Sequence, residues 1–148
     1  MDILLFAVFA FLLVIINAEM TKEQIKEISD SILQECKTET KAKDDDILIF
    51  NQSKLPTSRE GLCMVECFLD KVGMMSDGKY NKEGIVAALQ TVIKDDNEVK
   101  KLKTVAEVCY EKIGVGVADR CENAKSTLTC LVVDGQKHGF DLLKYSLG

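Results

Sequence analysis

The chain is poor in residues that interrupt helices and in residues typical of catalytic sites. Its 148 residues include one proline, one histidine and no tryptophan. A single proline, with good helix formers throughout, predicts an all-helical domain. The single histidine, His138, offers no multi-histidine metal site within one chain, and no catalytic set accompanies it. We therefore expect a protein that is not an enzyme and has no metal and no cofactor.

An excess of positive charge is also missing. All 19 basic residues and 23 of the 24 acidic ones (all except Asp2) lie beyond residue 18, which leaves that part four charges negative. A mildly acidic chain with scattered charge argues against nucleic acid and against an anionic membrane surface as partners. The chain has no internal repeat and no low-complexity tract, and its length after residue 18 fits one domain.

An apolar run of 14 residues, Ile3 to Ile16, lies at the start of the chain. It is shorter than the roughly 20 residues that span a bilayer and is typical of the hydrophobic region of a signal peptide. With Ala18 at the cleavage point, we expect a signal peptide over residues 1–18 and a secreted, extracellular domain over residues 19–148. The absence of Lys and Arg before the run departs from the usual pattern, and an uncleaved membrane anchor is the alternative.

Capping residues and apolar residues at helical spacing predict six helices. Thr21 and Gln24 form a capping box ahead of an apolar face that includes Ile28 and Ile32. We expect a turn at residues 76–78 and an apolar tail over residues 140–148 that packs on the domain. The six expected helices run from Thr21 through Cys36, over Asp44–Phe50, from Ser58 to Gly73, from Asn81 through Val92, from Asn97 to Gly114 and from Asp119 to Gly135. The expected N-caps are Thr21, Ser58, Asn81, Asn97 and Asp119.

Six cysteines with the spacing C-x26-C-x3-C-x41-C-x11-C-x8-C are the most informative feature of the chain. An even count behind a secretory signal predicts three disulfides. Cys63 and Cys67 lie one helical turn apart, with Cβ atoms too distant to bond to each other. Cys121 and Cys130 are nine residues apart and face opposite sides of one helix. Both exclusions shorten the fifteen connectivities that six cysteines allow and leave several open.

This cysteine order on a six-helix pattern resembles the insect odorant-binding and pheromone-binding proteins, and residues 71–80, KVGMMSDGKY, are similar to a loop of that family. The resemblance implies a compact all-α six-helix domain, stapled by disulfides, that encloses an apolar cavity. The family's pairing implies Cys36–Cys67, Cys63–Cys121 and Cys109–Cys130. A tight antiparallel hairpin of the last two helices would instead bring Cys109 near Cys121, so this pairing implies that those helices cross at an angle.

The resemblance implies a secreted carrier that binds odorants or pheromones in its cavity and delivers them through extracellular fluid. The alternatives are a non-olfactory carrier of a lipid, hormone or gland secretion, and an interaction protein with an incidental cavity. The expected partners are a small hydrophobic ligand and a membrane receptor, and the expected state is a monomer or weak homodimer. The candidate ligand-binding residues are Ile28, Ile32, Phe68, Val72, Met75, Ile85, Leu89, Val92, Val105, Leu128, Leu131, Phe140 and Leu142.

Three further motifs have competing interpretations. Asn51-Gln52-Ser53 is a sequon, which makes Asn51 a candidate glycosylation site. His138 is either a surface residue or a pH-sensitive residue that positions the tail, which either covers a groove or walls the cavity. Met74 and Met75 are either cavity lining or plain core.

Two acidic motifs are not expected to bind metal. The acids Asp44 to Asp46 are read as a helix start, where they favour the dipole. Residues 77–80 resemble part of a calcium loop, but the surrounding ligand positions do not fit, since Gly84 stands where the loop needs glutamate.

Overall fold

The computed structural model of the chain describes residues 19–146, so the expected signal peptide and the last two residues of the tail lie outside the described part. Between residues 19 and 146 the chain forms six α-helices, one two-stranded antiparallel sheet and one short 3-10 helix. This confirms the predicted all-α six-helix class. The elements are α2 (Lys22–Thr40), α3 (Asp44–Asn51), α4 (Arg59–Lys71), β1 (Met75–Ser76), β2 (Lys79–Tyr80), α5 (Lys82–Gln90), α6 (Asp96–Ile113), α7 (Arg120–Lys137) and η1 (Leu142–Tyr145).

Four predicted N-caps are confirmed, at Thr21, Ser58, Asn81 and Asp119. Each side-chain oxygen accepts a hydrogen bond from a backbone N–H in the first turn of its helix, and Thr21 forms the full capping box. Such a cap satisfies a backbone donor that the helix itself leaves unpaired. The helix starts are therefore encoded locally.

The prediction that Asn97 caps the fifth helix is wrong. Asp95 occupies this position, and its carboxylate accepts hydrogen bonds from the backbone N–H groups of Asn97 and Glu98. Both residue types are good caps, so composition does not separate them. An aspartate two residues earlier simply extends the helix by two residues at its start.

The prediction that Gly135 ends the last helix is also wrong. Helix α7 continues to Lys137, and Gly135 is buried inside it. The chain then folds back, and the backbone N–H of Phe140 donates to the Gly135 carbonyl at 2.9 Å. A Cβ added at Gly135 would lie 2.9 Å from the Phe140 carbonyl oxygen. This glycine is required for the close approach of the tail.

The predicted turn at residues 76–78 belongs to a small β-hairpin, which the sequence did not indicate because each strand has two residues. Asp77 and Gly78, the two central residues, both have positive φ, as the preferred two-residue hairpin turn requires. Tyr80 of β2 is buried, and its hydroxyl donates to the carbonyl of Ala106 in α6 at 2.8 Å. Burial raises the pKa of Tyr80, so this hydroxyl stays protonated.

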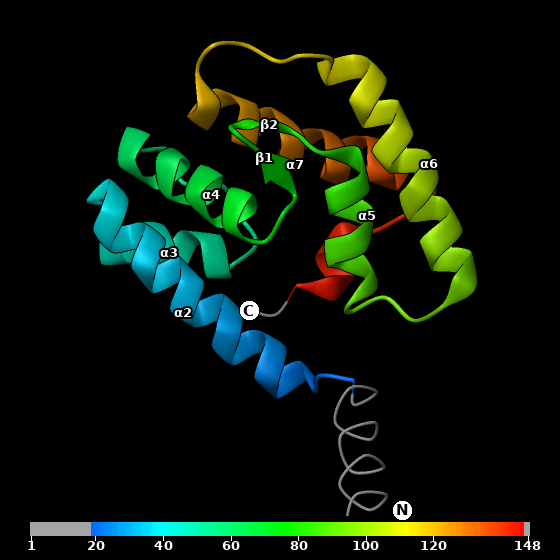
Figure 1. The fold of residues 1–148 in the computed structure, drawn as a ribbon, viewed down its shortest axis with the longest axis horizontal. Coiled ribbons are helices and arrows are strands. Elements are labelled where there is room, and N and C mark those ends of the chain that lie inside the picture. The colour runs from blue at the N-terminus through cyan, green and yellow to red at the C-terminus, as the bar shows by residue number, and fades with distance from the viewer. Residues whose placement is uncertain (1–18, 147–148) are drawn as a thin grey trace, which may run out of the picture.

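Figure 1 shows two groups of helices joined by α7. Helices α2, α3 and α4 form one group, α5 and α6 form the other, and α7 contacts both α4 and α6. A small core lies within the first group around Leu33 and Met64, and a larger one lies between α4, α5, α6 and α7. The 3-10 helix η1 returns to the space between the two groups. Within residues 19–146, no helix has the length and apolar character needed to cross a bilayer.

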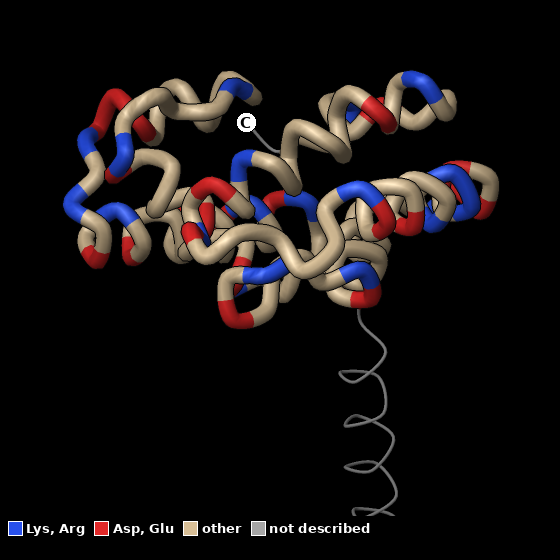
Figure 2. The backbone as a smooth tube through the Cα atoms, turned by 90° about the horizontal axis from the view of Figure 1, so that it is seen from above, with Lys and Arg blue, Asp and Glu red and all other residues tan. Residues whose placement is uncertain are grey.

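Charged residues are spread over the outer helices. Figure 2 shows Lys and Arg interspersed with Asp and Glu along the backbone. This distribution agrees with the scattered charge of the sequence.

Candidate ligand cavity

Three disulfides hold the cavity walls together, and all six cysteines take part. Cys36–Cys67 joins α2 to α4, and Cα atoms of the two residues lie 5.6 Å apart. Cys63–Cys121 joins α4 to the start of α7, and Cys109–Cys130 joins α6 to α7. These are the three pairs that the family resemblance implies. Cys109 meets the middle of α7 rather than its first turn, and the two helices cross (Figure 1).

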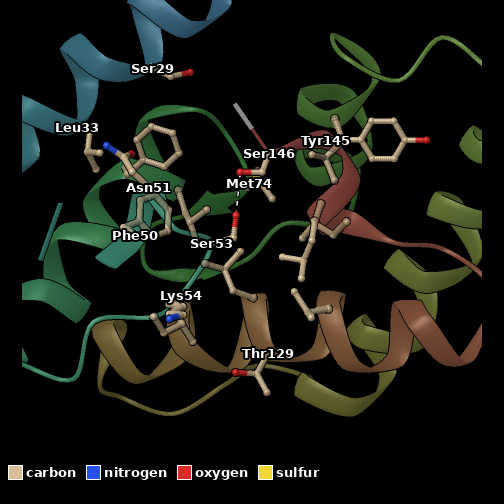
Figure 3. A pocket seen from close by; sticks show the side chains of 18 of the residues that line it. Ser29, Leu33, Phe50, Asn51, Ser53, Lys54, Met74, Thr129, Tyr145 and Ser146 are labelled. Carbon is tan, nitrogen blue, oxygen red and sulfur yellow. Dashed lines mark hydrogen bonds between the residues drawn. The ribbon is translucent and has the colours of Figure 1, made fainter. Parts of the chain in front are cut away.

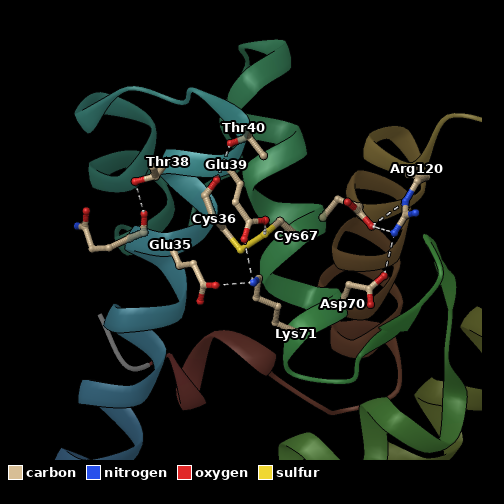
Figure 4. Close-up of a disulfide and its surroundings, with 11 residues drawn as sticks. Glu35, Cys36, Thr38, Glu39, Thr40, Cys67, Asp70, Lys71 and Arg120 are labelled. Carbon is tan, nitrogen blue, oxygen red and sulfur yellow. Dashed lines mark hydrogen bonds and ion pairs between the residues drawn. A yellow bond between two sulfur atoms is a disulfide. The ribbon is translucent and has the colours of Figure 1, made fainter.

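Ion pairs surround the first disulfide at the junction of α2 and α4 (Figure 4). The Lys71 ammonium lies 3.0 Å from carboxylate oxygens of Glu35 and of Glu39. Hydrogen bonds to these two acids raise the pKa of Lys71. On the other side of α4, Arg120 of α7 pairs with Glu66 at 2.9 Å and with Asp70 at 3.1 Å. Salt bridges and disulfides therefore fix the same helices.

A cavity of about 440 Å³ lies between α2, the end of α3, α4, α5, α7 and the tail (Figure 3). This volume is within the range of small-molecule sites. Most of the wall is apolar, and the polar residues come largely from α2, the end of α3 and the tail. The apolar lining residues are Leu33, Phe50, Leu55, Phe68, Leu69, Met74, Leu89, Leu128, Val132, Val133, Leu142 and Leu143. The polar ones are Ser29, Asp30, Asn51, Ser53, Lys54, Thr129, Tyr145 and Ser146.

The tail forms part of the cavity wall. Of the tail residues that the structure describes, four line the cavity: Leu142, Leu143, Tyr145 and Ser146. Its position is held by Phe140, which is fully buried and stacks on Tyr145 with ring centroids 6.0 Å apart. Of the two interpretations of the tail, a groove cover or a wall of the cavity, the structure matches the wall.

Two polar contacts connect the tail to distant parts of the chain. The Tyr145 hydroxyl donates to Glu98 in α6 at 3.1 Å, and the Ser53 and Ser146 hydroxyls are 2.8 Å apart (Figure 3). Partial burial, followed by the hydrogen bond to Glu98, raises the pKa of Tyr145. A hydrogen bond from Lys101 is the largest cause that lowers the pKa of Glu98, ahead of the one from Tyr145. Glu98 is therefore an ionised acceptor for the tail at neutral pH.

Four of the thirteen candidate ligand-binding residues line the cavity: Phe68, Leu89, Leu128 and Leu142. Of the others, Ile28 is 49% exposed on the outer side of α2, because the apolar face of that helix is wider than the contact it makes. Ile32 packs against the small core, and Val72 and Val92 pack against the large one. The remaining five are solid core, fully or almost fully buried away from the cavity: Met75, Ile85, Val105, Leu131 and Phe140.

Sequence reasoning missed several residues that line the cavity. For some of them the sequence did indicate an apolar segment. Leu69 and Met74 belong to segments recognised as apolar, but helical periodicity does not show which apolar residues border empty space. Met74 lines the cavity whereas Met75 is core, which decides between the two interpretations of that pair. Phe50 lies near the end of the short helix α3, and Leu55 lies in the loop that follows it, where no periodicity was available.

The other motifs occupy ordinary structural positions. Asp46 is buried and accepts from the backbone N–H of Lys43 and from the Ser58 hydroxyl, as a helix start would. Arg120 extends to within 3.3 Å of Asp77 in the hairpin turn and provides a cation there. His138 is exposed, and its Nδ1 lies 2.8 Å from the Asp134 carbonyl oxygen.

The sequon residue Asn51 is exposed and lies on the cavity rim at the end of α3. Its exposure makes the side chain accessible, and the use of the sequon stays a prediction.

Several insect proteins are similar to this chain in sequence or in fold. General odorant-binding protein 19d of Drosophila melanogaster is 28% identical over 128 residues, 85% of this chain and 84% of that protein. The structure of odorant-binding protein dmelOBP28a from Drosophila melanogaster has the same fold, with a TM-score of 0.68 and 20% identity over 81% of this chain and 99% of that one. The pheromone-binding protein of the cockroach Leucophaea maderae, solved with the fluorescent reporter ANS, gives a TM-score of 0.61 at 24% identity, over 77% of this chain and 97% of that one.

The family comparison covers most of the described domain. The sequence model of the PBP/GOBP family matches residues 18–133, from the start of the domain to the last turns of α7. This span includes all six cysteines and most of the cavity wall, and it ends before the tail. The fold, the three disulfides and this match together lead to one conclusion: the chain belongs to the PBP/GOBP family.

Proposed function

We propose that this protein is a secreted carrier that binds a small hydrophobic molecule in the cavity and delivers it through extracellular fluid. The observation that carries the proposal is the largely apolar cavity of about 440 Å³ between the two helix groups. Concave apolar sites with a few polar groups are the usual form of small-molecule binding sites. As a carrier, the protein would release its ligand chemically unchanged.

The disulfides support this proposal through stability. Side chains around an empty cavity lose packing contacts, and a domain of this size is only marginally stable. Each disulfide contributes about 2–4 kcal/mol in typical cases. The bonds between α2 and α4, α4 and α7, and α6 and α7 brace helices that line or adjoin the cavity. A hollow domain can thus remain folded without its ligand.

The expected affinity follows from the apolar wall. A flexible ligand of about twelve carbons gains up to about 10 kcal/mol from transfer, at about 0.8 kcal/mol per CH₂. Association and ordering cost several kcal/mol of this gain. The remainder, near 8 kcal/mol at best, corresponds to low-micromolar binding.

Displacement of a fluorescent reporter tests the proposal. ANS should bind the purified protein, and long-chain alcohols, esters and aldehydes should displace it and be recovered unchanged. Leu128→Trp, which places a large side chain on the cavity wall, should abolish binding. Val115→Trp, on a loop residue that is 83% exposed, is the matched control and should bind normally. If calorimetry detects no heat of binding for any compound of the panel, and none displaces the reporter, the cavity is incidental.

Odorant or pheromone delivery is the role that family membership favours for this carrier. A non-olfactory role uses the same cavity, because fold and site do not define the tissue in which a carrier works. Localisation of the protein in sensillar fluid would support the olfactory role. Localisation confined to a gland or to haemolymph would instead indicate transport of a secretion, hormone or lipid.

A further inference from the structure

We propose that the cavity selects ligands with a negatively charged head group, of the long-chain carboxylate type, and that Lys54 is the specificity-determining residue. This inference rests on the proposed carrier function and names the ligand class for it. It follows from the distribution of charge and exposure around the cavity.

Among residues 19–146, two of the residues that line the cavity are charged, Asp30 and Lys54. The Asp30 carboxylate lies 2.7 Å from the Lys26 ammonium one turn earlier in α2, so its charge is already compensated. No acidic partner lies within salt-bridge distance of the Lys54 ammonium among residues 19–146. The uncompensated charge on the described cavity wall is therefore positive.

Lys54 is also not needed to complete the helix before it. Three of the last four carbonyl groups of α3 are already occupied, since the Leu48 and Ile49 carbonyls accept from the backbone N–H of Gln52 and the Phe50 carbonyl accepts from that of Ser53. The backbone N–H of Lys54 itself donates to the Ile49 carbonyl. These bonds satisfy the acceptors that a cationic side chain would otherwise stabilise at a helix end.

The exposure of the lining residues indicates where the head group and the alkyl chain of a ligand would lie. Asn51, Ser53 and Lys54 are exposed and lie within four residues of the chain on the rim, whereas Leu69 and Met74 are buried. An amide N–H of Asn51 and the Lys54 ammonium are both donors for carboxylate oxygens. A long alkyl chain would then lie against Leu69 and Met74. The arrangement fits an amphipathic molecule with one anionic end.

Affinity measurements with three ligands of equal chain length test the inference: dodecanoate, dodecanol and dodecylammonium, each below the concentration at which it aggregates. We expect the wild-type protein to bind dodecanoate most tightly and dodecylammonium least. Lys54→Met keeps an apolar stem but removes the charge, and it should weaken dodecanoate binding about three- to tenfold without changing dodecanol binding. Raising the salt concentration to about 0.3 M should reduce the preference in the wild type.

Lys103→Met is the matched control, because Lys103 is an exposed lysine of α6 that does not line the cavity. It should leave all three affinities unchanged. Equal binding of dodecanoate and dodecanol by the wild type, or an equal loss of both in Lys54→Met, would overturn the inference while leaving the carrier function intact. Failure of all three ligands and of ANS to bind would instead contradict the carrier function itself. A thermal melt of Lys54→Met checks that the variant is folded.

Discussion

The Tyr145 hydroxyl lies 3.1 Å from the Glu98 carboxylate, which is 47 residues earlier in the chain. This bond attaches the C-terminal 3-10 helix, whose residues line the cavity, to α6. Figure 3 shows the Tyr145 ring directed away from the other labelled side chains, as a contact with α6 requires. The tail is thus held by this polar contact and by the one between Ser53 and Ser146, in addition to its apolar packing.

Tyr145→Phe should therefore loosen the tail and leave the fold intact. The ring and its stacking on Phe140 remain, but the hydroxyl that reaches Glu98 is lost. We expect ligand dissociation to become about two- to fivefold faster, as the loss of one hydrogen bond would allow. Stopped-flow release of ANS measures this rate. An unchanged rate would show that the bond does not restrain the tail.

The pH dependence of the same contact has a defined sign. The pKa of Glu98 is lowered in the folded protein, mainly by Lys101, from an ordinary value of 4.5. The stabilisation by its carboxylate is complete above that value and is lost as pH falls through the lowered pKa. Glu98→Gln should weaken ligand retention at neutral pH and reduce its change between neutral and strongly acidic pH. Tyr145 stays protonated throughout this range because its own pKa is raised.

Removal of the tail after Asp141 should reduce ligand affinity more than it reduces the melting temperature of the empty protein. The truncation removes Leu142, Leu143 and Tyr145 from the cavity wall but retains Phe140, which is fully buried. Calorimetry gives the affinity and a thermal melt gives the stability. Phe140→Ala is the contrasting variant, since loss of a buried phenylalanine costs about 3–5 kcal/mol of stability. Equal affinity with and without the tail would show that the tail only covers a groove and is not part of the binding site.

The disulfide pairing can be read from peptides of the unreduced protein. We expect Cys36–Cys67, Cys63–Cys121 and Cys109–Cys130 and no free thiol, and a Cys109–Cys121 peptide would contradict this connectivity. Removal of the Cys63–Cys121 bond, with a sequence separation of 58, should cost roughly 1 kcal/mol more than removal of Cys109–Cys130, with a separation of 21. The longer loop gains more freedom in the unfolded chain. Denaturant titrations of the two double serine variants measure the difference.

Thr127→Val should stabilise the protein. Thr127 is fully buried on α7, and among the described residues no partner lies within hydrogen-bonding distance of its hydroxyl. A methyl group of similar shape removes the cost of burying that hydroxyl, which is about 1 kcal/mol or more. The exposed Thr129 on the same helix is the control, and Thr129→Val should change the free energy of unfolding little. A lower melting temperature for Thr127→Val would indicate that a buried water satisfies the hydroxyl.

Local features were readable from the sequence because they depend on neighbouring residues. The capping oxygens of Thr21, Ser58, Asn81 and Asp119 contact N–H groups two or three residues away, so each helix start is encoded where it occurs. Gly135 shows where this reasoning fails. A glycine can end a helix, but here it lies inside one because Phe140 packs on it from the returning chain.

The cavity itself was decided by tertiary structure. Helical periodicity showed that Phe68, Leu89 and Leu131 face inward, but it could not show that the space beside Phe68 and Leu89 is empty while that around Leu131 is filled. That difference depends on how the two helix groups meet across α7 and on where the tail returns. Both are set by contacts between residues far apart in sequence, such as Ser53 with Ser146 and Glu98 with Tyr145, for which local pattern carries no information.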